Sequence, residues 1–475
     1  MVALCGAVWA AIPIGFGEDG NRSGQPAVSR DLAATYPELR AAISYKIAMS
    51  PHSGTDQLDL KIQTAQRLVR EAGDPLQFLE QLGWLYVAKA RASHDQGFYK
   101  LAEQCARAIE MIDSKAPEAM LLRGHVLISF HRFSEAESIA KQLVEQRTLP
   151  FDYGLLGDAL MEQGRLAEAV AAYQRMIDLR PDLQSYSRVA YLRWLKGDLE
   201  GAIEAARLAA NAASPVDPES TSWSLTRLGQ YQFQAGLFGE AQAACDSALR
   251  FSPNYPAALL LQSRLLLAAN QAGQAVALLQ RAVAANPLPE FQWALADALR
   301  ATGHADEAVK VETALKQTGA QDDPRTFSLF LATRGEQVEL AVELAQRELQ
   351  SRADMFTHDA LAWALAAAGR AEEAWPHMKK ALAEETADAR LFAHAGLLAA
   401  KLGRVSEAKL WLEKAQSIQR MLLPSEQQLV AGLAALAAPG KPEAISSAES
   451  STISAREHDL AKVSRAEKNK KGENQ

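Results

Sequence analysis

The most chemistry-like pattern in the sequence is a glycine-rich string near its start. Residues 15–20 read Gly-Phe-Gly-Glu-Asp-Gly and match the G-x-G-x-x-G spacing of a dinucleotide-binding loop. Such a loop leaves a strand and opens a helix, so that its backbone N–H groups meet a pyrophosphate. Here two carboxylates lie inside the string and Asn-Arg-Ser-Gly follows it, which is the wrong context for that role. We therefore predict no nucleotide cofactor at this string.

The histidines and cysteines do not form a catalytic or metal-binding pattern either. None of the nine histidines belongs to an H-E-x-x-H motif, and His358 points to a different helix face from its neighbour Asp359. The three cysteines, at positions 5, 105 and 245, are too far apart to form a CxxC pair. No G-x-S-x-G elbow or P-loop is present. We therefore predict that the chain is not an enzyme and has no catalytic residue, bound metal or cofactor.

The charge balance argues against a nucleic-acid partner. The sequence has 50 Lys and Arg residues and 57 Asp and Glu residues, which gives a formal net charge of −7. Contacts with phosphates need a basic surface. We therefore predict a protein or peptide partner, with neither a nucleic acid nor a small-molecule substrate.

The composition favours a chain made of packed helices. Hydrophobic residues make up 48% of the 475 residues, which is enough for an ordered structure, and runs of alanine are frequent. Ala has the highest helix propensity and lets helices approach closely. The alternating Val, Ile and Thr stretches that strands need are nearly absent. A chain of this length is too long for one ordinary core, so we expect several domains or a repeat array.

The first sixteen residues form an uncharged, strongly apolar leader. It has the apolar core of a secretory signal but lacks the basic residues that precede that core. It is shorter than the roughly 20 residues that span a membrane. Two interpretations stay open: the remnant of a signal peptide, or a disordered leader on a cytoplasmic protein. We favour a periplasmic or exported protein, and we expect membrane contact only if the leader is retained.

A repeat of 33 or 34 residues runs through most of the chain. It is marked by alanines whose successive spacings are 34, 33, 33, 39, 34, 33, 33, 33 and 34. A glycine lies five residues before many of these alanines and can take the left-handed conformation that ends a helix. The marker alanines are Ala102, Ala136, Ala169, Ala202, Ala241, Ala275, Ala308, Ala341, Ala374 and Ala408. The turn glycines are Gly164, Gly197, Gly236, Gly303, Gly369 and Gly403.

This pattern resembles the tetratricopeptide repeat, in which a helix with Leu-Gly is followed by a turn and a second helix with Ala. The unit that fits best contains Leu156, Gly157, Leu160, Gly164, Ala169, Tyr173 and Pro181. The resemblance implies an all-α fold, a right-handed superhelical solenoid of tandem helix-turn-helix repeats. It covers about residues 74 to 420. The unit of Ala341 departs from the pattern, because Leu329 replaces its small residue and Glu336 its turn glycine.

The pattern divides the chain into six segments. We expect about ten repeats, flanked by one capping helix at each end and by segments too polar to form a core. The predicted segments are an apolar leader at 1–16, a linker with one short helix at 17–54, an N-terminal capping helix at 55–73, the repeats at 74–424, a C-terminal capping helix at 425–438 and a disordered tail at 439–475.

The resemblance also implies where a partner binds. In this family the first helix of each hairpin lines a concave groove, and large aromatic or arginine side chains there can anchor a partner. An alternative is that these rings pack against the next hairpin or fill a tightly wound superhelix. The residues carried over to the groove are His125, Asp158, Tyr191, Trp194, Trp223, Phe233, Arg264, Trp293, Asp297, Phe330, Phe356 and Trp363.

The predicted function is therefore a scaffold that binds a peptide or protein segment in an open groove with exposed aromatic rings. Some members of the family grip a chain terminus with a Lys, Asn and Arg set. The position expected for that Asn holds no Asn in any of the units from the second onward, so this clamp is not expected. The alternative function is an assembly or regulatory subunit of an exported or envelope-associated complex.

Overall fold

The computed structural model describes residues 37–436, and within them it contains helices and turns but no strand. Ten helical hairpins follow one another between residues 76 and 417. The first five pair α4 (Leu76–Ser93) with α5 (Gly97–Glu110), α6 (Pro117–Ser129) with α7 (Phe133–Gln146), α8 (Pro150–Glu162) with α9 (Leu166–Leu179), α10 (Leu183–Leu195) with α11 (Leu199–Asn211), and α12 (Pro218–Gln234) with α13 (Phe238–Phe251).

The same architecture continues through the second half of the chain. The last five hairpins pair α14 (Pro256–Ala268) with α15 (Ala272–Ala285), α16 (Pro289–Ala301) with α17 (Ala305–Asp322), α18 (Pro324–Arg334) with α19 (Val338–Ser351), α20 (Met355–Ala367) with α21 (Ala371–Ala381), and α22 (Ala389–Lys401) with α23 (Val405–Ser417). The all-α solenoid expected from the sequence is therefore confirmed. None of the helices between residues 37 and 436 is long and apolar enough to cross a membrane.

The repeated alanines and glycines lie where two helices of a hairpin come close together. Ala169 is fully buried, and so are most of the other marker alanines. A Cβ atom added to Gly157 would come within 2.3 Å of the Tyr173 ring, and one added to Gly396 within 2.7 Å of Leu412. Larger side chains at these positions would force the helices apart.

The turn glycines end the first helix of their hairpins. Gly164 has φ +75°, and the N–H of Arg165 donates to the carbonyl of Leu160, which closes the helix end. The unit of Ala341, which lacks a glycine at the usual place, turns one residue earlier. There Gly335 takes φ +63°, so the hairpin forms despite the departure seen in the sequence.

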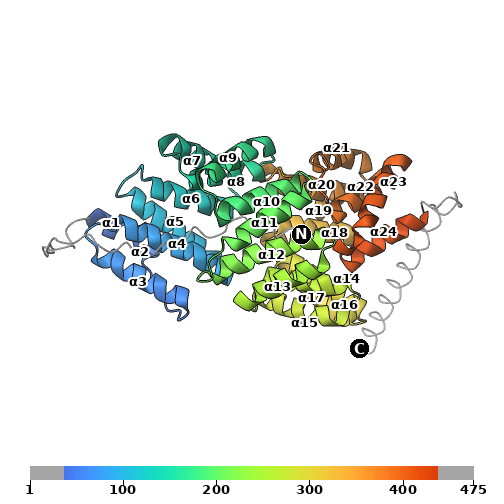
Figure 1. Ribbon diagram of the computed structural model, residues 1–475, viewed down its shortest axis with the longest axis horizontal. Coiled ribbons are helices and arrows are strands. Elements are labelled where there is room, and N and C mark those ends of the chain that lie inside the picture. Colours follow the sequence, from blue (N-terminus) through green and yellow to red (C-terminus); the bar gives the residue numbers. More distant parts are fainter. Residues whose placement is uncertain (1–36, 437–475) are drawn as a thin grey trace, which may run out of the picture.

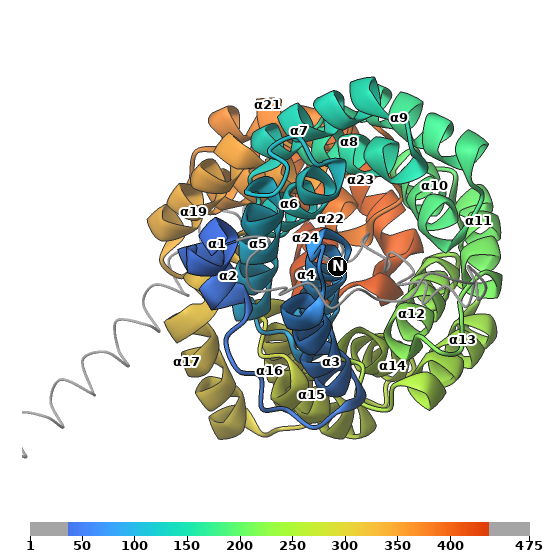
Figure 2. The ribbon, with the colours of Figure 1, turned by 90° about the vertical axis from the view of Figure 1, so that its left-hand side faces the viewer.

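The hairpins wind into a superhelix whose successive turns touch (Figures 1 and 2). The first helices of the hairpins lie nearer the centre of the ring, and the second helices lie outside them. Residues about 190 positions apart meet where two turns touch. Lys196 Nζ is 2.6 Å from Glu384 Oε2, and the Thr386 hydroxyl donates to the Leu195 carbonyl. We call this line of contacts the seam.

The linker predicted for residues 17–54 includes a short helix expected at residues 30–49, and the structure places two short helices within that range. Its part beyond residue 36 forms α1 (Pro37–Ala41) and α2 (Ile43–Ala48), followed by α3 (Gln57–Glu71). The chain is fixed here because the Tyr86 hydroxyl donates to the Ala48 carbonyl at 2.7 Å and Ala48 is fully buried. Residues 1–36 and 437–475, which include the leader and the tail, lie outside the described residues.

Candidate functional site

Every residue predicted to line the groove lies on the first helix of its hairpin, from α6 to α20. Their environment differs from the prediction, because nearly all of them are buried. Trp293 is 1% exposed, Phe330 0% and Trp363 6%. The expected open groove with exposed aromatic rings is therefore not what the structure contains.

The burial has a direct cause in the tight winding of the superhelix. Adjacent first helices bring their rings together, as in the edge-to-face pair of Trp293 and Phe330, whose centroids are 5.7 Å apart. Rings from different turns also stack. Trp194 on α10 lies 5.6 Å from Phe356 on α20, with the two ring planes 14° apart. These rings pack the interior and the seam, which is the alternative that the sequence left open.

Two of the predicted polar groove residues are also part of the packed interior. Asp158 on α8 is 1% exposed and accepts hydrogen bonds from the guanidinium of Arg188, with one N–O distance of 2.7 Å, and from the Tyr173 hydroxyl. Burial raises the pKa of Asp158, and Arg188 opposes that rise. His125 is 4% exposed and packs edge-on against Trp84. Their contacts stabilise the fold.

The seam contains a second group of buried charges, which sequence reasoning missed. Arg352, at the end of α19, lies 2.5 Å from Glu162 at the end of α8, in the turn of the superhelix before it. Arg325 on α18 pairs with Asp354 at 2.8 Å. A cavity of about 250 Å³ opens beside these charges, and its lining includes Met161, Tyr191, Phe356, His358 and Lys380. Glu162 lies 190 residues before Arg352, so no local sequence pattern predicts their meeting.

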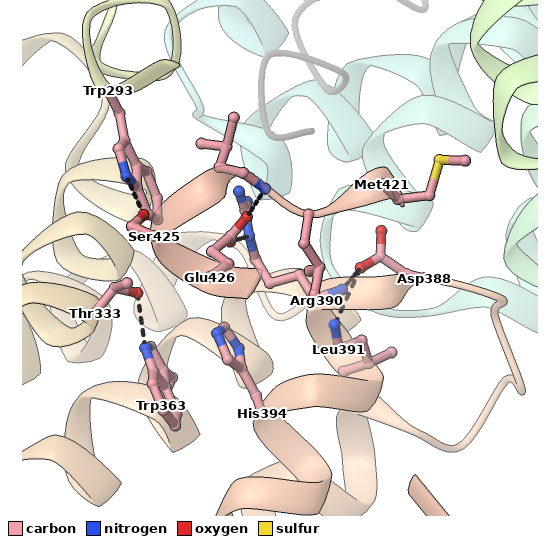
Figure 3. A network of polar contacts seen from close by, with 12 residues as sticks. Trp293, Thr333, Trp363, Asp388, Arg390, Leu391, His394, Met421, Ser425 and Glu426 are labelled. Atoms are coloured by element: carbon pink, nitrogen blue, oxygen red, sulfur yellow. Dashed lines mark hydrogen bonds and ion pairs between the residues drawn. The ribbon is translucent and has the colours of Figure 1, made fainter. Parts of the chain in front are cut away.

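One part of the inner face holds a segment of the same chain. After α23 the chain forms a short turn, η2 (Gln419–Met421), and then α24 (Pro424–Leu436). In Figure 2, α24 lies inside the ring, and Figure 3 shows its first turn against Trp293 and Arg390. The predicted C-terminal capping helix thus packs on the last hairpin and also reaches α16, about 130 residues earlier.

Four residues of the inner face, which we call the concave site, contact this C-terminal segment: Trp293, Asp297 and Arg390 contact α24, and Arg264 contacts Met421 of η2. Asp297 accepts hydrogen bonds from the Ser425 backbone N–H at 2.9 Å and from its hydroxyl at 2.5 Å. The Trp293 indole N–H donates to the same hydroxyl at 3.4 Å. Three of the four residues were predicted groove residues, and Arg390 was not.

Charge is matched across the concave site. The Arg390 guanidinium donates to the Glu426 carboxylate and lies 5.0 Å from the centroid of the Trp293 ring. Burial opposes the charge of Glu426, but Arg390 keeps the pKa of that carboxyl below its usual value. Burial raises the pKa of Asp297 to about 6, although Ser425 opposes the rise. The site can therefore hold a polar segment by charge-assisted hydrogen bonds.

Metal binding and nucleophilic chemistry need particular arrangements of histidines, cysteines and carboxylates. Among residues 37–436, no three His, Cys, Asp or Glu side chains are placed to hold a metal ion. Cys105 and Cys245 are buried, and burial raises the pKa of both thiols, which disfavours the thiolate that a nucleophile needs. His358 and His377 place their Nδ1 atoms 3.0 Å apart, and burial lowers the pKa of both imidazoles.

Comparison with known families matches the tetratricopeptide repeat in three parts of the chain. The matched residues are 154–218, 232–292 and 389–420. They include the best repeat found in the sequence and the last hairpin before α24. The repeats within these three ranges are thus of this type.

Individual proteins resemble parts of the chain. The anaphase-promoting complex subunit 7 of Arabidopsis thaliana is 31% identical over 139 residues, which are 29% of this chain and 24% of that protein. The chain therefore spans about a quarter of the length of this relative. A human IFIT1 dimer with PPP-AAAA is 15% identical, with a TM-score of 0.43 over 68% of this chain and 77% of that one. Yeast Tom70 is 12% identical, with a TM-score of 0.34 over 80% and 92%.

Proposed function

We propose that the chain, which contains tetratricopeptide repeats, is a protein-interaction scaffold and that it binds a helical segment of a partner protein at its concave site. The observation that carries the proposal is the position of α24, a helix that this surface already holds through Asp297, Trp293 and Arg390. A surface that fits one helix has the shape and the hydrogen-bonding groups to receive another. The name of the Arabidopsis relative, a complex subunit, agrees with a scaffold role.

The composition of the concave site favours a protein ligand over other classes. It combines a buried carboxylate, two guanidinium groups and an indole ring, which suits the mixed polar and apolar surface of a helix. Arg and Trp are also the residue types that most often anchor protein partners. The formal net charge of −7 adds no general attraction for nucleic acid.

A matched pair of arginine substitutions tests the proposal. Arg264 lies in the concave site, whereas Arg281 is exposed on α15, where it contacts Asn254. We expect Arg264→Ala to lower partner recovery in affinity purification at least tenfold, because the partner loses a buried donor. Arg281→Ala is the control and should recover as much partner as the wild type.

Chemical cross-linking of the recovered complex locates the contact. Cross-links from the partner should fall on α14, α16 and α22 and not on the outer helices α15 and α17. Circular dichroism establishes that both variants keep their helices. Equal recovery by the two variants, or cross-links confined to the outer helices, would rule out the concave site as the place of binding.

The apolar leader motivates a further proposal, that the scaffold works in an exported or envelope-associated complex. Residues 1–16 carry no charged side chain and have the apolar core of a secretory signal. N-terminal sequencing of the protein isolated from its native cells tests this. Export predicts a mature chain that begins beyond the leader, and a cytoplasmic protein retains it.

A further inference from the structure

We propose that α24 is an internal competitor for the partner, and that the concave site selects a helix whose first turn carries a hydroxyl residue followed by Glu and which lacks its own N-cap. This inference rests on the proposed function and specifies the ligand of the same site. It makes partner binding conditional on the release of the chain's own C-terminal helix.

The key feature is the way in which the start of α24 is capped. The first backbone N–H groups of a helix have no partner within the helix, and a polar side chain just before it usually accepts one of them. Here the preceding residue is Leu423, whose hydrocarbon side chain cannot accept a hydrogen bond. Asp297 accepts the N–H of Ser425 instead, at 2.9 Å, from a helix 128 residues earlier. The concave site therefore supplies the N-cap of the helix that it holds.

The next two residues of α24 explain the selectivity for a hydroxyl and a carboxylate. The Ser425 hydroxyl donates to Asp297 at 2.5 Å and accepts from Trp293. Glu426 bonds back to the N–H of Leu423 at 2.7 Å and pairs with Arg390. A negative charge in the first turn also interacts favourably with the helix dipole. A helix without this Ser and Glu would leave buried charges of the site without partners.

The match between α24 and the site is incomplete, which leaves room for a better ligand. Arg264 donates from Nη1 to the Met421 carbonyl at the long distance of 3.4 Å. Its Nε atom is buried and has no hydrogen-bond partner among the residues that the structure describes. Arg264 Nη2 lies 3.6 Å from Glu290 Oε1, which is too long for a good hydrogen bond, so a partner segment with a carboxylate near Nε would gain a charge-assisted hydrogen bond that the chain's own C-terminal segment does not make.

The tether gives α24 an advantage that a partner must overcome. Because α24 is joined to the last hairpin by the short η2 turn, its local concentration at the site is high, of the millimolar order. Three apolar side chains, those of Leu422, Leu423 and Val430, are also buried with it. A partner helix has to displace α24 and form the same contacts. A substitution that weakens the binding of α24 to the concave site should therefore raise the affinity of the site for any helix of the same type.

The experiment uses the full-length protein and a fluorescein-labelled peptide of residues 419–436, with binding followed by fluorescence anisotropy. Glu426→Ala in the protein weakens its own α24 but leaves Asp297 and Arg390 in place. We expect this variant to bind the peptide at least tenfold more tightly than the wild type does. Adding Asp297→Ala to the same chain should reverse the gain. Gln428→Ala, at an exposed position of α24, is the matched control and should bind like the wild type.

A second variant, Ser425→Ala, removes a single hydroxyl of α24 and replaces Glu426→Ala in this experiment if that variant does not fold. If folded variants bind the peptide no better than the wild type, α24 does not compete for the concave site and the proposal is wrong. A gain in affinity that remains after Asp297→Ala would also contradict the proposal. The partner-recovery experiment is independent of these results. If partner recovery still depends on Arg264 while α24 does not compete, the proposed scaffold function is supported and only the role of α24 is rejected.

Discussion

At the scale of single residues, one ion pair joins two turns of the superhelix. Glu162 and Arg352 are 3% and 6% exposed in their side chains and lie 2.5 Å apart. Burial raises the pKa of Glu162, and Arg352 opposes this effect, so the charge of the carboxylate depends on the guanidinium beside it. A buried pair of this kind contributes little beyond the cost of its burial, but it is costly to break.

This asymmetry predicts the effect of removing one partner. Arg352→Met should destabilise the protein by about 3 kcal/mol, because it leaves a buried carboxylate without its counter-charge. Glu162→Gln in the same chain should restore part of the loss, since it removes the stranded charge of Glu162 but not the contacts that Arg352 also makes with Glu348, at 3.5 Å, and with Asp354, at 3.8 Å. Urea unfolding followed by circular dichroism measures both. Arg370→Met is the control, because the pair of Arg370 with Glu373 is exposed and its loss should change little. A single variant as stable as the wild type would show that the pair does not hold the turns together.

At the scale of elements, the hairpin turns differ in what lies beside them. Gly164 and Gly403 both have a positive φ, of 75° and 68°. A Cβ atom added to Gly164 would come within 2.2 Å of the Ala353 backbone oxygen on the next superhelical turn, whereas one added to Gly403 would meet nothing within 4 Å. Gly164 therefore shapes both its own hairpin and the seam.

Alanine substitution should separate these two effects. Both Gly164→Ala and Gly403→Ala place a side chain in the left-handed region, which costs roughly 1 kcal/mol. We expect Gly164→Ala to lower the thermal unfolding midpoint at least twice as much, because its methyl group also meets a backbone atom that cannot rotate away. Differential scanning calorimetry measures the two midpoints. Equal decreases of the two midpoints would mean that the seam accommodates the added methyl group without loss of stability.

The elements were largely predictable, and their environment was not. The spacing of Ala169 and its equivalents, with the turn glycines, was enough to place the hairpins, because the pattern reflects contacts within one repeat. The sequence also placed Arg264, Trp293 and Asp297 on the first helices, where they form the concave site. It could not show that Trp363 is buried or that Ser425 meets Asp297, because those contacts join residues from different repeats.

At the scale of the whole molecule, the decisive feature is the closure of the superhelix on itself. The pitch of a repeat array is the sum of a small rotation at every repeat, so slight differences in packing decide between an open spiral and touching turns. No single residue in the sequence encodes that sum. The seam, with Thr386 bonded to Leu195 and Trp194 stacked on Phe356, is where the closed form differs from an open one.

Closure can be tested in the unmodified protein with a zero-length carbodiimide cross-linker. Such a reagent joins an amine to a carboxylate only when the two are in contact, and Lys196 Nζ lies 2.6 Å from Glu384 Oε2 across the seam. Both side chains are partly exposed, at 47% and 29%, so the reagent can reach them.

We expect mass spectrometry to find this cross-link between residues 188 positions apart, in a monomeric fraction. Lys409 and Glu413, 3.9 Å apart on one helix, provide an internal control for the reaction. A product with the local cross-link and without the seam cross-link would mean that the superhelix is open in solution. In that case the part of the inner face that α24 does not cover would be accessible to a partner, while the concave site would still be occupied by α24.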